Sequence, residues 1–245
     1  MSMTMTIARR EFAGYFATPV AYVFIVIFLV MTGVFTFNVG SYFERGEADL
    51  MPFFQFHPWL YMLLIPAISM RLWSEERKSG TIELLMTLPI PLRSAVLGKF
   101  LAAWAFTGVA LALTFPIVLT VNYLGDPDNP VILSGYIGSM LMAGGFLAIG
   151  ACISAFTKNQ VIAFVLSFVA CFAFNLCGYP VVLDFFSVWA PAAIVELIST
   201  LSFLTHFEAI QKGVLDFRDV LFFLSTIALW LFLNMLVVAS NKAKP

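Results

Sequence analysis

Residues 74–85 read Ser-Glu-Glu-Arg-Lys-Ser-Gly-Thr-Ile-Glu-Leu-Leu, a charged segment between two long apolar stretches. The chain around it is 61% hydrophobic and 11% charged, with a mean hydropathy of +0.96, whereas a soluble domain has about 25% charged residues. In 245 residues the polar stretches are all short, which leaves room for one helix bundle and no separate soluble domain. The sequence therefore predicts a single-domain, all-α, polytopic membrane protein that presents residues 74–85 to water.

The apolar segments are long enough to cross a bilayer as helices. Residues 1–18 come first and place Met5, Ala8 and Phe12 near helical spacing, with the charged side chains clustered elsewhere, as in a helix lying in the lipid headgroup region. Proline residues inside the second predicted span indicate a kink or a broken start. The six predicted spans are residues 20–39, 53–73, 96–124, 134–156, 161–178 and 217–240.

The fourth predicted span, residues 134–156, is rich in small side chains. Gly135, Ser139 and Ala143 recur at every fourth position, and a second series starts at Gly144. Small residues let helix backbones approach closely. We therefore expect this span to pack against other helices on two sides.

Residues 181–204 are ambiguous, because they are apolar but include Asp184 and Glu196. Counting them as a seventh span would place the carboxy-terminal lysines outside, whereas six spans put ten of the thirteen cations on the inner side, as the positive-inside rule favours. The prediction is thus a re-entrant pair of short helices on the outer side. Residues 205–208, Thr-His-Phe-Glu, match a capping box, Gly213 is a natural helix stop, and Asp216 can cap the last span.

Several kinds of chemistry are disfavoured. A phosphate-binding loop at Gly98-Lys99 would need glycine in place of Arg93 and serine or threonine in place of Phe100. The Glu75-Glu76 pair leaves an intramembrane metalloprotease as a minor alternative, but that pattern requires arginine at position 80, and His57 and His206 are expected in outer loops. We predict no catalytic residue, no metal site and no cofactor in this chain. The three asparagines expected within spans, read as helix–helix contacts, are Asn122, Asn175 and Asn234.

The charged segment has the features of a docking helix. Thr81 can cap a short helix, with Glu83 in its first turn where the helix dipole favours an acid. Ile82, Leu85 and Met86 share one face, and the helix must stop before Pro89. A helix of about seven residues is not stable alone in water, so we expect it to dock on a partner.

The segment from Glu75 to Leu85, followed by Pro89, resembles the E-x-x-x-G-T-x-E-x-L-x-x-x-P motif of ABC-2 type permeases, the membrane subunits of a class of ABC exporters. The resemblance covers the whole chain, with an interfacial first helix, six spans and short re-entrant helices before the sixth. Residues 206–216, His-Phe-Glu-Ala-Ile-Gln-Lys-Gly-Val-Leu-Asp, are similar to a segment of the gliding-motility-associated subgroup.

This resemblance implies a coupling helix, residues 81–88, that sits in a cleft of a cytoplasmic ABC ATPase. The residues it implies as ATPase contacts are Glu75, Glu76, Arg77, Gly80, Thr81, Ile82, Glu83, Leu85 and Met86, with Lys158 and Asn159 as a smaller second contact. Gly80 would allow the turn into the helix.

The resemblance also implies the setting. ATP and Mg would be bound by the ATPase, and a second permease, identical or related and possibly fused to a large extracytoplasmic domain, would complete the assembly. The expected location is the bacterial inner membrane, with both termini cytoplasmic and no nucleic-acid partner. From another class, a membrane anchor that recruits a cytoplasmic partner without moving anything remains the alternative.

Overall fold

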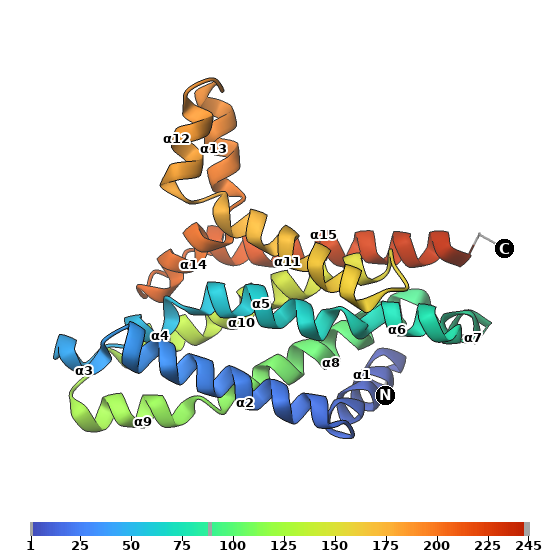
Figure 1. Cartoon of the computed structure of the whole chain (residues 1–245), viewed down its shortest axis with the longest axis horizontal. Helices are drawn as coiled ribbons and strands as arrows, with labels where there is room; N and C mark the ends of the chain where they lie inside the picture. The colour runs from blue at the N-terminus through green and yellow to red at the C-terminus, as the bar shows by residue number, and fades with distance from the viewer. Residues whose placement is uncertain (1, 88–89, 243–245) are drawn as a thin grey trace.

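The computed structural model describes residues 2–87 and 90–242, with the side chains at positions 84–86, 241 and 242 outside that description. All regular structure in the described part is helical, and no described residue forms a strand. The helices are α1 Met3–Phe16, α2 Pro19–Val34, η1 Phe35–Val39, α3 Tyr42–Arg45, α4 Met51–Phe54, α5 His57–Ser69, α6 Arg71–Ser79, α7 Thr81–Thr87, α8 Leu92–Ala112, α9 Phe115–Leu124, α10 Asn129–Ser154, α11 Gln160–Leu176, α12 Pro180–Ser187, α13 Ala192–Thr200, α14 Phe203–Gln211 and α15 Phe217–Lys242 (Figure 1).

Helix α10 is the centre of the bundle. In its most apolar eighteen-residue stretch 83% of the residues are buried, against 22–39% for the other three long apolar helices. Small residues make this possible: a Cβ atom added at Gly145 would come within 2.5 Å of the Phe203 ring, and one at Gly135 within 2.5 Å of Phe54. The predicted close packing on two sides of this helix is confirmed, because Phe54 and Phe203 come from different helices.

Helices α5, α8, α11, α14 and α15 surround α10. Of these, α5 is buried along most of its length. The predicted second span, residues 53–73, is divided in the structure into α4, α5 and the start of α6. The break before His57 agrees with the broken start expected from the proline at position 58, and a second break falls at Met70.

Four helical stretches of the described chain are long and apolar enough to cross a membrane: Pro19–Arg45, Leu92–Leu124, Asn129–Ser154 and Phe217–Ser240. Two bent helix pairs, α11 with α12 and α13 with α14, raise the number of candidates to six if each counts as one span. The chain is therefore an all-helical, multi-pass membrane protein. The stretch 53–73 is not among these candidates, because its helices are individually short.

Helices α12 and α13 form a hairpin that leaves the side of the bundle (Figure 1). The chain bends by 75° between α11 and α12, and by 60° between α13 and α14. Neither hairpin helix has a buried residue. Residues 181–204 are thus not one straight helix, and their re-entrant position in the membrane stays a prediction.

The predicted capping box at residues 205–208 is wrong. Ser202 is the N-cap of α14, because its backbone is extended and its hydroxyl oxygen accepts the amide N–H of Thr205 at 3.1 Å. The helix therefore begins at Phe203, before Thr205. The other two end signals are confirmed: Gly213 follows α14 with φ +86°, and the Asp216 carboxylate accepts the Arg218 amide N–H at 3.0 Å, at the start of α15.

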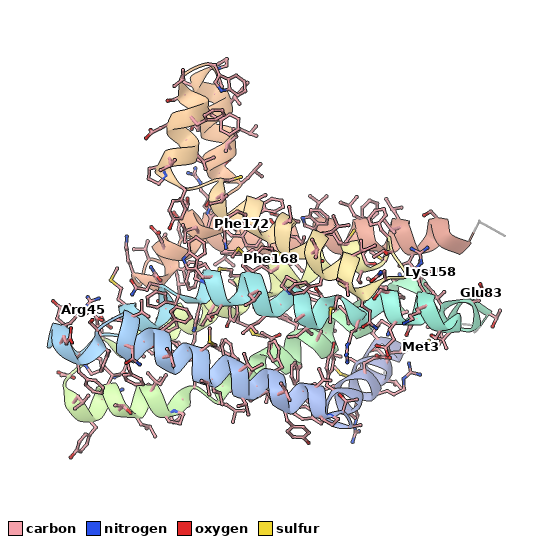
Figure 2. All side chains as sticks on the ribbon, viewed as in Figure 1. Met3, Arg45, Glu83, Lys158, Phe168 and Phe172 are labelled. Atoms are coloured by element: carbon pink, nitrogen blue, oxygen red, sulfur yellow. The ribbon has the colours of Figure 1, made fainter. Side chains whose placement is uncertain are left out.

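Helix α1 and the end of α15 lie at the same end of the bundle, together with α6 and α7 (Figure 1). We call this the α7 end. Figure 2 shows Glu83, Lys158 and Met3 toward this end and Arg45 at the opposite one. The described side chains of the helices and turns at this end include the cations Arg9, Arg10, Arg71, Arg77, Lys78, Arg93, Lys99 and Lys158 and the carboxylates Glu11, Glu75, Glu76 and Glu83.

The opposite end and the hairpin have the reverse balance. Their only described cations are Arg45, Lys212 and Arg218. Their carboxylates are Glu44, Glu47, Asp49, Asp126, Asp128, Asp184, Glu196, Glu208, Asp216 and Asp219. The net charge of the chain is only −1, because the excess of cations at one end of the bundle nearly balances the excess of carboxylates at the other.

Candidate functional site

The corner between α6 and α7 projects at the α7 end (Figures 1 and 2). Gly80 makes the corner with φ +75°, a left-handed backbone conformation that favours glycine. No other group lies within 4 Å of a Cβ atom built at Gly80, so the need for glycine comes from the backbone rather than from crowding. The turn expected at this position is therefore present, and α7 begins directly after it.

Thr81 connects α7 back to α6. Its hydroxyl group lies 2.9 Å from the Ser79 hydroxyl and 3.5 Å from the Glu76 carbonyl oxygen. The prediction that Thr81 caps α7 is corrected here, because Thr81 is already the first residue of α7 and its hydroxyl serves the end of the preceding helix. Glu83 is in the first turn of α7, as predicted, and is exposed.

The apolar face predicted for α7 is described at one position. Ile82 is half-buried and packs against the core of the bundle, so it does not lie on an outward docking face. The side chains of Leu85 and Met86 lie outside the described residues, as do Leu88 and Pro89, where the helix is predicted to end.

Glu76 points into the bundle. Its Oε1 lies 2.7 Å from Nζ of Lys99 in α8, and the same Nζ lies 3.2 Å from Oε2 of Glu11 in α1. The Lys99 side chain is only 6% exposed. We call these three residues the Lys99 triad. The triad joins three helices, and its central ammonium also lies 5.6 Å from the ring centroid of the buried Trp73 in α6.

The charges of the triad affect Glu11 directly. Burial alone would raise the pKa of Glu11, but Lys99 and Arg10 outweigh that effect and hold the pKa of Glu11 below its ordinary value. Glu11 therefore stays ionised at neutral pH, which is the state that Lys99 needs, because an unpaired buried ammonium is strongly disfavoured.

Arg77, the next residue, points to a different part of the bundle. Its guanidinium donates a hydrogen bond to the carbonyl oxygen of Ala155, just after α10. The polar turn that follows holds Lys158 and Asn159, both exposed. The Asn159 side chain caps α11 by accepting the Val161 amide N–H at 2.9 Å. Arg77 thus connects the two segments that were predicted to contact the ATPase.

Glu76 and Arg77, two of the predicted contact residues, are half-buried and bonded within the bundle, and their contact with a partner stays a prediction. Their charge suggested a solvent-facing role, but α6 packs against the bundle on this side. The predicted contact residues that remain exposed at this end are Glu75, Gly80, Thr81, Glu83, Lys158 and Asn159.

The sequence did contain a signal for the Lys99 triad. Lys99 lies inside the predicted span 96–124, and an isolated lysine in an apolar helix needs a carboxylate partner. Glu11 is 88 residues away in the sequence, so only the folded chain shows which carboxylate is near. A cavity of about 300 Å³ lies beside the triad, between α1, α6 and α8, and is lined by residues that include Tyr15, Thr18, Arg71 and Glu75.

The histidines are not in loops, which corrects the prediction. His57 begins α5 and is fully buried, with its Nδ1 2.8 Å from the Ser139 hydroxyl oxygen. His206 lies in α14, where Nδ1 is 2.5 Å from Asp219 Oδ1 and Nε2 is 3.0 Å from the Thr200 carbonyl oxygen. Both histidines thus fasten helices together.

The asparagines predicted as helix contacts differ in what they do. Asn175 Nδ2 donates to the Pro58 carbonyl oxygen at 3.2 Å, which joins α11 to α5. Asn122 and Asn129 exchange side-chain hydrogen bonds of 3.1 and 3.0 Å across the loop after α9. The Asn234 Oδ1 is buried without a hydrogen-bond partner in the described part of the chain.

His57 lies apart from the Glu75-Glu76 pair along the chain. No three His, Cys, Asp or Glu side chains within residues 2–87 and 90–242 gather as a metal site. His57 precedes Glu75 by the whole of α5 and part of α6, a helical path on the order of 25 Å at 1.5 Å per residue.

The fold and this site together define a class: a multi-pass helical membrane protein that presents a charged corner at one end of its bundle. Comparison with known families narrows the class. The model of the ABC-2 family of transporter proteins matches residues 5–240, and the chain belongs to that family.

Two curated relatives are similar to this chain. They are the heme exporter protein B of Paracoccus denitrificans, 30% identical over 137 residues, and the heme exporter protein B of Rhodobacter capsulatus, 30% identical over 128 residues. The matches cover 54% and 52% of this chain and 59% and 54% of the relatives, so the chain spans little more than half the length of the relatives it matches.

Family membership gives the general role. The chain is a membrane protein of a family of ABC-2 transporter proteins.

Proposed function

We propose that this permease subunit transmits ATP-driven movement of a separate cytoplasmic ATPase into the membrane and thereby drives export. The observation that carries the proposal is the exposed corner at Gly80; just before it, Arg77 bonds to the Ala155 carbonyl oxygen, three residues before the exposed Lys158. Two segments far apart in the sequence, marked by Glu83 and Lys158, thus lie toward the same end of the bundle (Figure 2). A short exposed helix beside charged groups suits a protein groove.

The charge distribution supports an orientation. The α7 end holds most of the cations, and cytoplasmic segments of bacterial membrane proteins carry an excess of lysine and arginine. In this proposal the α7 end and both termini face the cytoplasm of a bacterial inner membrane. The acidic end and the α12–α13 hairpin then lie on the outer side.

ATP and Mg belong to the ATPase in this proposal. The residues of this chain offer contact and not nucleotide binding: Glu75, Glu83 and Lys158 are exposed and could pair with charges on the ATPase surface. The chain lacks the glycine and hydroxyl pattern of a phosphate-binding loop around Lys99, and the Lys99 side chain is occupied by two carboxylates.

A second permease completes the assembly, and by resemblance to gliding-type systems it is a related chain with a large extracytoplasmic domain rather than a second copy. The substrate we propose is an apolar or amphipathic molecule, because the predicted spans hold few ionisable side chains. The name of the relatives, heme exporter protein B, supports this class, since heme is a large and mostly apolar ring.

The test is co-purification with the ATPase encoded beside the gene. Glu83→Lys combined with Leu85→Asp reverses a charge on α7 and replaces an apolar side chain of that helix by an acid, and we expect the ATPase to be lost from the complex. The matched control is Glu47→Lys at the opposite end, which leaves the complex intact. Undiminished complex and full stimulation of the ATPase by the double variant would sink the proposal.

An assay of the same complex in liposomes distinguishes the transporter hypothesis from the anchor hypothesis. In liposomes, the anchor hypothesis predicts a stable complex with the ATPase and no ATP-dependent movement of any substrate, and our proposal predicts movement that stops in the double variant.

A further inference from the structure

We infer that Lys99 is a positioning residue that passes movement from α6 to the amphipathic helix α1, so that the ATPase drives α1 as well as the spanning helices. The inference rests on the proposed function. It begins with an arrangement that the motif does not include: one buried ammonium held between Glu76 of α6 and Glu11 of α1.

Helices α1 and α8 already form one unit without the triad. A Cβ atom added at Gly98 would lie 2.7 Å from Ile7 Cγ2, so the two helices are in close contact there. Tyr15 stacks on Phe106 with ring centroids 4.9 Å apart. The Lys99–Glu11 pair therefore contributes little to the packing of α1 on α8. Its effect is that Glu11 of α1 and Glu76 of α6 bind the same ammonium group.

Helix α6 has a different connection to this unit. The Lys99–Glu76 pair, at 2.7 Å, and the approach of Lys99 to Trp73 join α6 to α8 at a buried position. The cavity of about 300 Å³ beside the triad leaves open space between α1, α6 and α8. At this pocket the ion pairs of Lys99 are the printed contacts that connect α6 with α1.

The energetics make the triad a firm link. Removing one partner of a buried ion pair leaves an uncompensated charge, which costs far more than the loss of an exposed pair. A displacement of α6 that would separate Glu76 from Lys99 is therefore opposed, and α8 and α1 follow. Chains of packed side chains and ion pairs carry coupling between distant elements, and the Lys99 triad is such a chain.

The experiment uses the complete complex of permease and ATPase, with Cys177→Ser and an environment-sensitive fluorophore on Met5→Cys, an exposed position of α1. We expect ATP to change the fluorescence in the otherwise unmodified permease. In Lys99→Met the ATPase still co-purifies, but the ATP-dependent change at α1 is lost. Lys99→Arg keeps the charge and restores it.

The matched control is Arg9→Met, which removes one positive charge from an exposed position of the same helix and keeps the response. If Lys99→Met does not fold, Glu76→Gln is the second variant, with an uncharged side chain of nearly equal size. We expect it also to lose the ATP-dependent change at α1. An unchanged response in Lys99→Met, or in Glu76→Gln, overturns the inference.

The two proposals fail in different ways. If the unmodified permease retains no ATPase, the proposed function falls and this inference falls with it. If the ATPase is retained and stimulated but α1 of the unmodified permease does not respond to ATP, only the inference about Lys99 is overturned.

Discussion

Gly80 and Glu76 show how two residues of one short motif serve different purposes. Gly80 has a backbone conformation that L-amino acids rarely adopt, with φ +75° and open space where a side chain would be. Glu76 is four positions earlier and has its carboxylate on a buried lysine. The motif therefore combines a shape requirement at the surface with a charge requirement inside the bundle.

The shape requirement predicts the effect of Gly80→Ala. The new methyl group meets no neighbour, so the cost is that of the left-handed backbone alone, about 1 kcal/mol of unfolding free energy. The matched control is Gly14→Ala in α1, where a Cβ atom also meets nothing but the backbone is helical; there we expect a gain of about 0.5 kcal/mol. Thermal unfolding in detergent measures both, and equal effects would contradict this explanation.

For single residues, the sequence predicted where turns and helix ends occur better than it predicted which way the side chains point. The glycine turn at Gly80 and the acid in the first turn of α7 follow from local rules, and the structure has both of them. The inward direction of Glu76 and Arg77 was missed. Their partners, Lys99 and the carbonyl of Ala155, come from segments that only the tertiary fold brings near.

Single helices were predicted well where a local signal breaks the chain. A proline accompanies the predicted break before α5, and Asp216 caps the start of α15 as predicted. The break between α8 and α9, inside the predicted span 96–124, was not predicted. The start of α14 was placed three residues late, since two hydroxyl residues could both serve as caps. The N-cap in the structure is Ser202, whose side chain is buried and lies near the unpaired amides of the first turn of α14.

The cap of α14 can be tested directly. Ser202→Ala removes the acceptor of the Thr205 amide N–H and is expected to cost about 1 kcal/mol of stability. The sequence pattern favoured Thr205 as the cap, but its side chain is exposed. Thr205→Ala is therefore expected to reduce stability less than Ser202→Ala. Denaturant unfolding followed by tryptophan fluorescence compares the two, and a larger loss for Thr205→Ala would return the cap to Thr205.

For the whole molecule, the composition was sufficient to predict a helical multi-pass membrane protein. It was not sufficient to count crossings. The second predicted span is three helices, and α11 continues into α12 through a 75° bend. Hydropathy measures how apolar a segment is and contains no term for its direction, so bent and straight segments give the same signal.

The separation of charge between the two ends predicts the topology. In a chain with Cys177→Ser, Ser79→Cys is expected to react with a membrane-impermeant maleimide only from the cytoplasm. Glu47→Cys and Ser199→Cys are expected to react only from outside. Labelling of inside-out and right-side-out vesicles decides the matter, and cytoplasmic labelling at Ser199 would require an additional crossing before α13.

The hairpin of α12 and α13 has a consequence for the history of the chain. Because no side chain of either helix is buried, substitutions there disturb the packing around α10 very little, and exposed substitutions away from special features usually change stability by at most about 0.5 kcal/mol. Mutations in the hairpin thus change the stability of the fold very little. They affect fitness mainly through the molecules that the hairpin contacts. Among related permeases, we therefore expect the sequence of the hairpin to diverge with little effect on the bundle.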